Sequence, residues 1–360
     1  MPLFYGGLVA STIRYARELA LMAAAVEGSL RVRLRANRGR DDRSKLRILG
    51  YSSTYLPQHR GGSEVTLHRL LQELRARGHE TRVLVDEASR PQVVDGIDVQ
   101  LADDRTVVRE HFEWSDIVVA QLKTRQRAIY LSARYSRPLA YLVQIGNSPI
   151  ATLAGSPDLT VFSSQFVQEQ YPSSEPSLVV HPLVPEAEYL TTPGDRITLI
   201  NLAEIKGGRL FFDLADRLPE REFLGVAGWG KQVGGPVLPN VSFMRPTADV
   251  RAVYSRTRVL LMPSSYESYG RVALEAAVSG IPTIAHPAGG LVEALGDAGL
   301  WADRDDPDAW IAQLRRLDDP DEYAAQSRRV RQRFERLSPQ SELDTLEASL
   351  MALSHGIPVS

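Results

Sequence analysis

The chain has 360 residues, 43% of them hydrophobic and 24% charged, which is typical of a folded protein of about two domains. The net charge of −2 argues against a nucleic-acid partner, and the absence of cysteine excludes disulfides, thiolate metal sites and a cysteine nucleophile. No apolar run approaches the roughly 18–20 residues that a membrane-spanning helix needs, so we expect a cytoplasmic protein.

The first 44 residues differ from the rest of the chain. Residues 11–26 have the spacing of an amphipathic helix, and a segment with five arginines between residues 31 and 40 follows. One interpretation is an arm that makes a peripheral contact with a membrane or a partner, and the other is an extension that packs on its own domain or stays disordered. We favour the second because Asp41 and Asp42 dilute the positive charge.

Residues 45–188 alternate between short apolar runs and helical patterns. The segment SEVTLHRLLQELRARG is typical of an amphipathic helix that ends at Gly78. The runs typical of buried strands are LRILGYS, TRVLV, DIVVAQ, PLAYLVQ, LTVFSS and SLVVHPLV. Strands that alternate with helices predict a parallel α/β sheet, and we expect this stretch to form an N-terminal Rossmann-like domain.

Residues 189–337 repeat the alternation after the polar stretch 188–196, which we interpret as a linker. TLINLA, REFLGVAG, VSFM, RVLLMPS and PTIAH are the expected strands, and they predict a C-terminal Rossmann-like domain. Two such domains leave a cleft at the carboxyl ends of their strands, where ligands bind. The tail predicts two helices, and we expect the last one, in residues 338–360, to cross back to the first domain.

Two glutamates flank a predicted helix start in the segment YESYGRVALEAAVSG. Glu267 falls in the loop after RVLLMPS, and Glu275 falls in the second turn of a helix expected over residues 271–279. Gly270 removes a side chain where the chain turns into this helix. Two exposed glutamates are the alternative, but the apolar neighbours of Glu275 make a carboxylate without partners costly there.

The start of that helix favours an anion. We expect its first N–H groups, from Arg271, Val272 and Ala273, to be free and to carry the positive end of the helix dipole, which attracts phosphate. Ionised carboxylates on either side suit a polyhydroxylated ligand, because sugar hydroxyls are good donors and each carboxylate offers several acceptor sites.

Lys206 is one of only four lysines in the chain, and it follows a predicted strand in the loop NLAEIKGG. A compact ammonium beside Gly207 and Gly208 suits a phosphate, which we favour over an exposed lysine without a function. The pair Gly61 and Gly62 is weaker evidence, since two glycines fit either a tight turn or a close approach of backbone to a ligand.

The segment ESYGRVALEAAVSGIPTIAHPAGGLVEAL resembles the E-x7-E signature of retaining, GT-B-fold glycosyltransferases of group 1 (family 4). The resemblance extends over about residues 45–340 and includes RGGSEVTLHRLLQELRARGHETRVLV, NLAEIKGG and the pair GWG and NVSFM. It implies an α/β, GT-B fold in which two Rossmann-like domains with parallel sheets face each other across a cleft. The N-terminal domain would present the acceptor, and the C-terminal domain would bind a nucleoside-diphosphate sugar.

The resemblance also implies roles for individual residues. Glu267 aligns with the glutamate that contacts the donor sugar, Glu275 with the one that binds the ribose, and Lys206 with the lysine that neutralises the donor diphosphate. Glu267 and Lys206 are therefore the expected catalytic residues. The other expected donor-binding residues are Gly61, Gly62, Asn201, Gly270, Arg271 and Val272.

Three positions depart from the family pattern. Asn201 stands where an arginine is usual, and Gln121 and Gln144 stand at two frequent histidine positions on the acceptor side. Glutamine can hold a sugar hydroxyl but cannot titrate, so the acceptor side has no visible general base. In the mechanism that the resemblance implies, the leaving diphosphate itself takes the acceptor proton.

We therefore expect an enzyme that moves a hexose from a nucleoside-diphosphate sugar to a hydroxyl of a sugar, a lipid-linked glycan or a small molecule, without a metal or an organic cofactor. One alternative is a sugar-nucleotide epimerase-hydrolase, and another is a non-catalytic nucleotide-sugar-binding subunit, which Gln121 and Gln144 would suit. We interpret His181 and His286 as structural histidines, and Asp303 and Asp305 as parts of a solvated loop.

Overall fold

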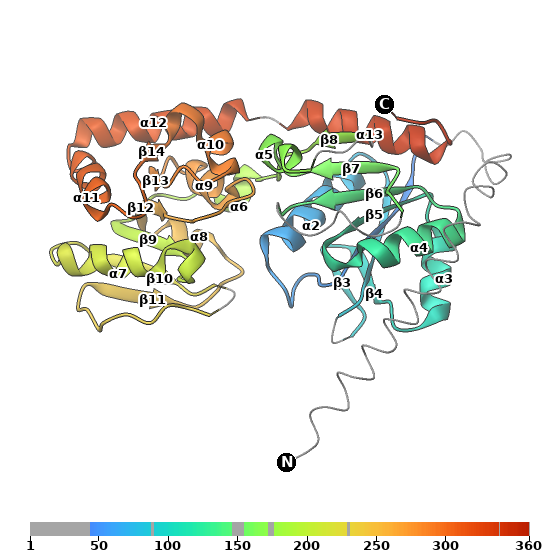
Figure 1. The fold of residues 1–360 in the computed structure, drawn as a ribbon, viewed down its shortest axis with the longest axis horizontal. Helices are drawn as coiled ribbons and strands as arrows, with labels where there is room; N and C mark the ends of the chain where they lie inside the picture. Colours follow the sequence, from blue (N-terminus) through green and yellow to red (C-terminus); the bar gives the residue numbers. More distant parts are fainter. Residues whose placement is uncertain are drawn as a thin grey trace, which may run out of the picture. The chain divides into compact units, whose positions relative to one another are not determined.

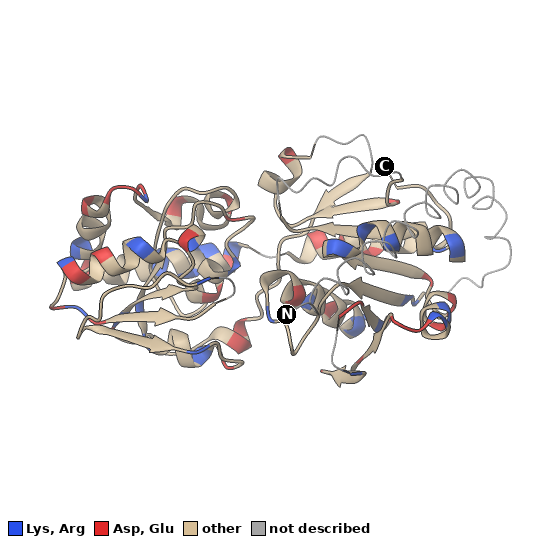
Figure 2. Ribbon diagram, turned by 60° about the horizontal axis from the view of Figure 1, so that its bottom comes forward, with Lys and Arg blue, Asp and Glu red and all other residues tan. Residues whose placement is uncertain are grey.

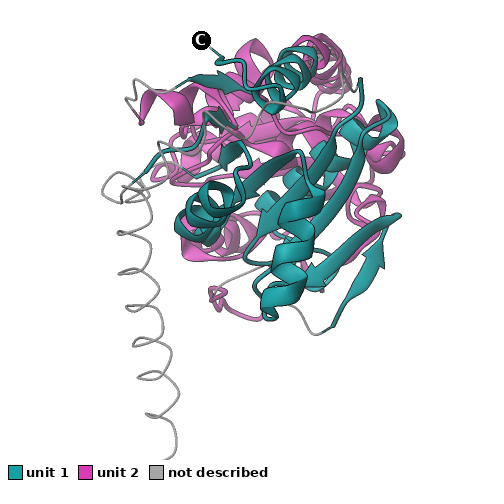
Figure 3. Cartoon of the chain, turned by 90° about the vertical axis from the view of Figure 1, so that its right-hand side faces the viewer, with its two compact units in different colours: residues 1–162, 172–179, 342–360 teal, residues 163–171, 180–341 magenta. Residues whose placement is uncertain are grey.

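The computed structural model describes residues 44–87, 90–145, 155–171, 176–228, 231–337 and 339–359. Its two compact units are shown in different colours in Figure 3. The first contains the described residues up to 162, 172–179 and 342–360, and the second contains 163–171 and 180–341. The amphipathic helix and the basic segment expected before residue 44 lie outside the described residues, and the domain bounds expected from the sequence stay predictions.

The first unit is an α/β structure around an eight-stranded sheet, counted in its described residues, with the order β3-β4-β2-β1-β5-β6-β7-β8. Neighbouring strands are parallel except for β3 and β4, which form an antiparallel hairpin. The strands are β1 (Arg47–Ser52), β2 (Glu80–Val85), β3 (Gln92–Val94), β4 (Ile97–Leu101), β5 (Ile117–Gln121), β6 (Leu139–Val143), β7 (Leu159–Phe162) and β8 (Ser177–Val179).

Helices connect the parallel strands of this unit (Figure 1). They are α2 (Gly62–Ala76), α3 (Arg105–Trp114), the 3₁₀ turn η1 (Leu122–Thr124) and α4 (Arg125–Tyr135). The helix α2 ends at Ala76, and the expected glycine follows two residues later at Gly78, whose φ of 101° only glycine adopts without strain. The last helix, α13 (Gln340–Ser354), contributes its residues from 342 onward to the first unit, where Glu347 accepts hydrogen bonds from Arg77 and His79.

The second unit contains a fully parallel six-stranded sheet in the order β11-β10-β9-β12-β13-β14, again counted in the described residues. The strands are β9 (Arg196–Ile200), β10 (Phe223–Val226), β11 (Val241–Met244), β12 (Thr257–Met262), β13 (Thr283–Ala285) and β14 (Leu300–Trp301). The helical segments are α5 (Gln165–Glu169), α6 (Glu186–Tyr189), η2 (Glu204–Lys206), α7 (Gly208–Arg217), α8 (Arg251–Tyr254), α9 (Arg271–Ala277), α10 (Gly290–Leu295), η3 (Gly296–Ala298), α11 (Pro307–Arg316) and α12 (Pro320–Arg336).

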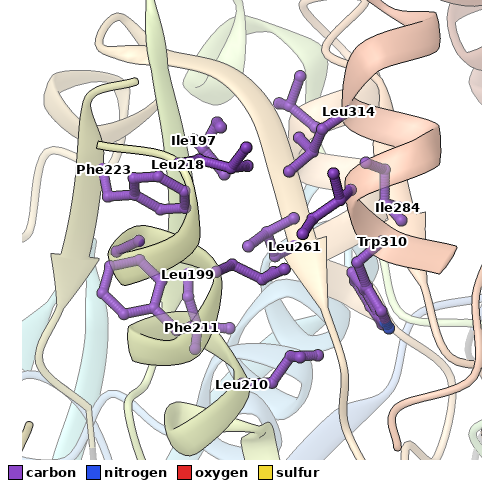
Figure 4. Packing of buried hydrophobic residues seen from close by; sticks show 14 of the residues in the cluster. Ile197, Leu199, Leu210, Phe211, Leu218, Phe223, Leu261, Ile284, Trp310 and Leu314 are labelled. Atoms are coloured by element: carbon purple, nitrogen blue, oxygen red, sulfur yellow. The ribbon is translucent and has the colours of Figure 1, made fainter. Parts of the chain in front are cut away.

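Hydrophobic side chains cover both faces of this second sheet, as a parallel sheet requires. Along β12, Val259 and Leu261 join a cluster with residues of α7 and α11, while Leu260 and Met262 join a cluster with residues of α6, α8, α9 and α10. Figure 4 shows the first cluster, in which the fully buried Trp310 packs with the sheet residues Leu261 and Ile284.

The strand order predicts a ligand site between β9 and β12. When the six strands are numbered along the chain, their order is 3-2-1-4-5-6, so the connections leave β9 and β12 toward opposite edges of the sheet. Loops after such a pair diverge and leave room for a ligand at the carboxyl ends of the strands. The first unit has the same arrangement at β1 and β5.

The expected α/β fold with two largely parallel sheets is confirmed. One difference is α9, which ends at Ala277 rather than Ser279, followed by Gly280 with a φ of 67°.

Acidic and basic residues are interspersed over both units (Figure 2), in keeping with the small net charge of the chain. In the described residues, no helix combines the length and apolar character needed to span a bilayer.

Candidate active site

The loop after β9 places Lys206 at the carboxyl end of this interior strand of the second sheet. The chain leaves the strand at Asn201 with a positive φ of 71° and forms the short turn η2, which ends at Lys206. Gly207 follows with a φ of 86°, and a Cβ atom there would lie 2.4 Å from Pro263 Cγ. Glycine at this position therefore lets the Lys206 loop approach the end of β12.

Lys206 and Glu267 form an ion pair across the β9–β12 switch point. The distance between Lys206 Nζ and Glu267 Oε1 is 2.5 Å, and the Ser264 hydroxyl donates to the same oxygen at 2.7 Å. The N–H of Ser265 donates to the carbonyl of Ile205 at 2.9 Å, so the two loops are joined through their backbones as well. The structure thus brings together the two residues expected to be catalytic.

Helix α9 begins as the sequence predicted. Gly270 has a φ of 100°, and a Cβ atom there would lie 2.4 Å from Leu291 Cδ1, so two features favour glycine. No hydrogen bond of the Arg271 or Val272 N–H occurs in the described residues. The expectation of a free N–H at Ala273 is wrong, because it donates to the Gly270 carbonyl at 2.9 Å in a tightened first turn.

Glu275 is buried, with only 4% of its surface exposed, and it has the partners that a buried carboxylate needs. The Tyr254 hydroxyl donates to Glu275 Oε2 at 2.7 Å, and Arg271 Nη2 lies 3.3 Å from Oε1. Burial and the Glu275 carboxylate raise the pKa of Tyr254 well above its usual value, so this phenol remains a donor. Burial opposes the charge of Arg271, but Glu275 together with Tyr189, Tyr254 and Glu188 outweighs burial and raises the pKa of the guanidinium.

Two atoms of this buried group make no hydrogen bond within the described part of the chain. They are Glu275 Oε1, an acceptor, and Arg271 Nη1, a donor. A hydroxyl group can donate to the first and accept from the second, so the pair is chemically complementary to a sugar hydroxyl. The sequence did not predict Tyr254, which lies 21 positions before Glu275.

Asn201, one of the expected donor-binding residues, organises the neighbouring backbone. Its Oδ1 accepts from the N–H of Ala203 at 3.1 Å and from Gln232 Nε2 at 3.2 Å, and Gln232 Oε1 in turn accepts from the N–H of Leu202. Asn201 Nδ2 is buried and makes no hydrogen bond among the described residues, so it is the donor that could reach a phosphate oxygen. No cation stands at this position.

The residues expected on the acceptor side lie in the first unit. Gln121, the last residue of β5, is fully buried and donates to Ser52 Oγ at 3.1 Å, and its Oε1 accepts from Gln144 Nε2. Gln144 Nε2 also donates to the carbonyl of Ser63 at 3.4 Å. The two expected residues therefore form one amide network behind the start of α2.

Gly61 and Gly62 mark the start of α2 in different ways. Gly61 is the residue before the helix, and a Cβ atom there would lie 2.4 Å from Glu64 Oε2. A Cβ atom on Gly62 would meet nothing within 4 Å. Both have ordinary backbone angles, so close packing of Glu64 rather than a left-handed turn explains the first glycine.

A further polar chain in the first unit was not predicted. The Tyr55 hydroxyl lies 2.8 Å from His68 Nδ1, and His68 Nε2 lies 2.9 Å from Asp95 Oδ2. Burial lowers the pKa of His68 despite the neighbouring Asp95 carboxylate.

The turn before α11 fits the expected solvated loop, since the Asp305 side chain is 91% exposed.

A family model described as "Glycosyl transferases group 1" matches residues 198–319. D-inositol 3-phosphate glycosyltransferase of Corynebacterium urealyticum is 43% identical over 75 residues, which are 20% of this chain and 18% of the relative. The protein of the same name from Corynebacterium jeikeium is 30% identical over 138 residues, 32% of this chain and 33% of the relative. The chain thus spans a third or less of the length of these curated relatives.

Solved structures resemble the chain over most of its length. HepE of Anabaena, in complex with UDP and glucose, has a TM-score of 0.70 at 17% identity and covers 85% of this chain and 99% of its own. Sucrose-phosphate synthase of Thermosynechococcus elongatus has a TM-score of 0.67 at 15% identity, with coverages of 85% and 100%. The two α/β units are therefore those of a GT-B fold. The residues that match the group 1 model, 198–319, lie within the second unit.

Proposed function

We propose that this chain is a retaining glycosyltransferase that moves a hexose from a nucleoside-diphosphate sugar to a hydroxyl acceptor. The observation that carries the proposal is the ion pair of Lys206 and Glu267 at the switch point of the group 1 domain. An ammonium beside a carboxylate offers separate partners for a diphosphate and for sugar hydroxyls. Catalysis then rests on orienting the donor and on stabilising the departing diphosphate.

The buried group around Glu275 supports a ribose-containing donor. A ribose hydroxyl that donates to Glu275 Oε1 and accepts from Arg271 Nη1 satisfies both atoms that lack a hydrogen bond. HepE structures contain UDP and UDP-glucose, so a uridine donor is the first to test. Asn201 Nδ2 and the N–H groups of Arg271 and Val272 complete the proposed phosphate contacts.

The acceptor binds in the first unit in this proposal, near Gln121 and Gln144. Both amides hold hydrogen bonds and neither can titrate, so the leaving diphosphate takes the acceptor proton. No metal or organic cofactor takes part. A cytoplasmic location completes the proposal, and a peripheral membrane contact through residues 1–44 remains the less favoured alternative for that segment.

The test follows donor turnover by NMR with UDP-glucose, GDP-mannose and ADP-glucose, each with and without a panel of hydroxyl acceptors. The panel includes D-inositol 3-phosphate, which the relatives' names contain. We expect nucleotide release that depends on an acceptor, and a product with the anomeric configuration of the donor. Inversion of the configuration would contradict the retaining mechanism.

Two outcomes would favour the alternatives. Donor cleavage to free sugar at the same rate without an acceptor would identify a sugar-nucleotide epimerase-hydrolase. Donor binding by calorimetry without turnover on any acceptor would favour a binding subunit, which the amide network of Gln121 and Gln144 in place of a titrating group would suit.

A further inference from the structure

Glu293, on α10, accepts hydrogen bonds from two segments that lie far from it in the sequence. Its Oε1 accepts from the N–H of Gln165 at 3.0 Å and from His181 Nε2 at 2.6 Å, and its Oε2 accepts from the N–H of Phe166 at 3.2 Å. Burial acts against its ionisation, but the hydrogen bonds from His181 and from the two N–H groups outweigh burial and lower the pKa of Glu293. The ionised carboxylate can only accept, which makes His181 Nε2 a donor.

These partners lie where the chain passes between its two units. The chain leaves the first unit after residue 162, spends residues 163–171 in the second, returns for 172–179 and enters the second again at residue 180. Gln165 and Phe166 follow the first passage, and His181 follows the last one. One carboxylate on α10 therefore fastens both entering segments to the second unit.

The first of these segments also contacts the loop of Glu267. The Ser164 hydroxyl accepts from the N–H of Val167 at 3.1 Å, which caps α5, and donates to the carbonyl of Ser268 at 2.6 Å. The Phe166 ring lies 5.9 Å from the Tyr266 ring, centroid to centroid. Residues 164–166 thus contact both neighbours of Glu267 in the sequence: Ser268 through its carbonyl and Tyr266 through its ring.

The start of α10 holds the same loop from another side. The N–H of Gly290 donates to the carbonyl of Glu267 at 3.0 Å. A Cβ atom on Gly289 would lie 2.5 Å from that carbonyl oxygen and 2.6 Å from Phe166 Cε1. Only glycine lets α10, the Glu267 loop and Phe166 approach one another this closely.

We propose that Glu293 is a positioning residue for Glu267, which it holds in place through Ser164, Phe166 and the Ser268 carbonyl. The inference rests on the proposed function only in assigning Glu267 to the donor sugar. A catalytic group that moves by about 1 Å can lose roughly a hundredfold in rate. Without the Glu293 carboxylate, two backbone N–H groups and His181 Nε2 lose their acceptor, and the segment is no longer fixed against the loop.

Hydrogen exchange tests this positioning without any assumption about the reaction. We expect Glu293→Ala and Ser164→Ala to speed amide exchange in residues 264–270 by roughly tenfold or more, with unchanged exchange in β9. Glu335→Ala, which removes an exposed carboxylate from α12, is the control and should leave the loop unchanged. Unchanged exchange in the loop, or equally faster exchange throughout the second unit, would overturn the proposal.

Kinetics with UDP-glucose tests the consequence. We expect Glu293→Ala to lower kcat by roughly ten- to a hundredfold while the affinity for UDP, measured by calorimetry, stays within about twofold. Glu293→Gln keeps the shape of the side chain and one acceptor oxygen, so it should restore part of kcat. The double variant of Glu293→Ala with Ser164→Ala should lose no more of kcat than the more impaired of the two single variants, because both changes break one linkage.

Additive losses in the double variant, or a matching loss of UDP affinity, would contradict the positioning role. If the unaltered chain turns over no donor, the proposed function fails, and the exchange measurement alone then decides whether Glu293 holds the loop.

Discussion

Lys206 Nζ lies 2.5 Å from Glu267 Oε1, and the two residues lie in the loops that follow β9 and β12. Both side chains are largely buried, with 19% and 14% of their surfaces exposed, so each charge is the main counter-ion of the other. A donor that places a diphosphate at the ammonium and a sugar at the carboxylate must compete with this pair. The two roles can therefore be separated by changing one charge at a time.

Removal of the Glu267 charge should affect the sugar and spare the nucleotide. Glu267→Gln keeps the size of the side chain but frees Lys206 for the diphosphate, so UDP affinity should stay equal or rise. The ratio of the affinity for UDP-glucose to the affinity for UDP should fall by roughly tenfold or more. The reason is that a hydrogen bond to a charged group contributes about 1.5–3 kcal/mol. Calorimetry with UDP and UDP-glucose measures both, and an equal loss for the two ligands would count against the assignment.

The Tyr254–Glu275–Arg271 group should select ribose. We expect UDP to bind roughly ten- to a hundredfold more tightly than its 2′-deoxy or 3′-deoxy analogue, because a missing hydroxyl leaves buried polar atoms without a partner. Tyr254→Phe releases Glu275 Oε2 and should reduce this preference as well as the affinity for UDP. Competition binding with the three nucleotides measures the preference, and equal affinities for all of them would rule out this ribose contact.

Gly270 should be more sensitive to substitution than another glycine of the same unit. Gly270→Ala forces a side chain into a left-handed conformation and against Leu291, which should lower the free energy of unfolding by about 1–3 kcal/mol. A Cβ atom on Gly234 meets no heavy atom within 4 Å, so Gly234→Ala should change stability by less than about 0.5 kcal/mol. Denaturant unfolding of both variants checks the comparison, and equal effects would contradict it.

His68 should make the first unit less stable in mild acid. Burial lowers its pKa in the folded chain, so between that pKa and the value of about 6.5 in the unfolded chain the unfolded state binds more protons. The contribution of His68 to stability is therefore present above pH 6.5 and is lost as the pH falls through the folded-state pKa. An NMR titration of the imidazole should give a pKa below about 6.5, and a higher value would reverse the sign of this dependence.

Local patterns predicted most of the elements. The apolar face of α2, the glycine after it and the polar entry into α11 were sufficient, because helix ends depend on neighbours in the sequence. The β3–β4 hairpin was missed although Asp95 and Gly96 have the positive φ angles of a tight turn. A strand of three residues such as β3 is too short for a periodic pattern.

The site was predicted only in part, for a related reason. The positions of Lys206, Glu267 and Glu275 followed from spacing and resemblance, but their partners come from other elements. Tyr254 reaches Glu275 from α8, and Glu293 reaches Gln165 across 128 positions, so both contacts depend on the order in which the strands pair. Periodicity does not specify that order. Alignment to a motif identifies the motif residues but not the side chains from other elements that hydrogen-bond to them or to their neighbours.

Calorimetric titration with UDP tests the central claim most directly, because the account assigns Lys206 and Glu275 to two parts of one nucleotide. Lys206→Ala and Glu275→Ala should each weaken UDP binding by roughly tenfold or more, while Arg328→Ala, on an exposed part of α12, should leave it unchanged. Equal binding by all three variants would contradict the proposed donor site.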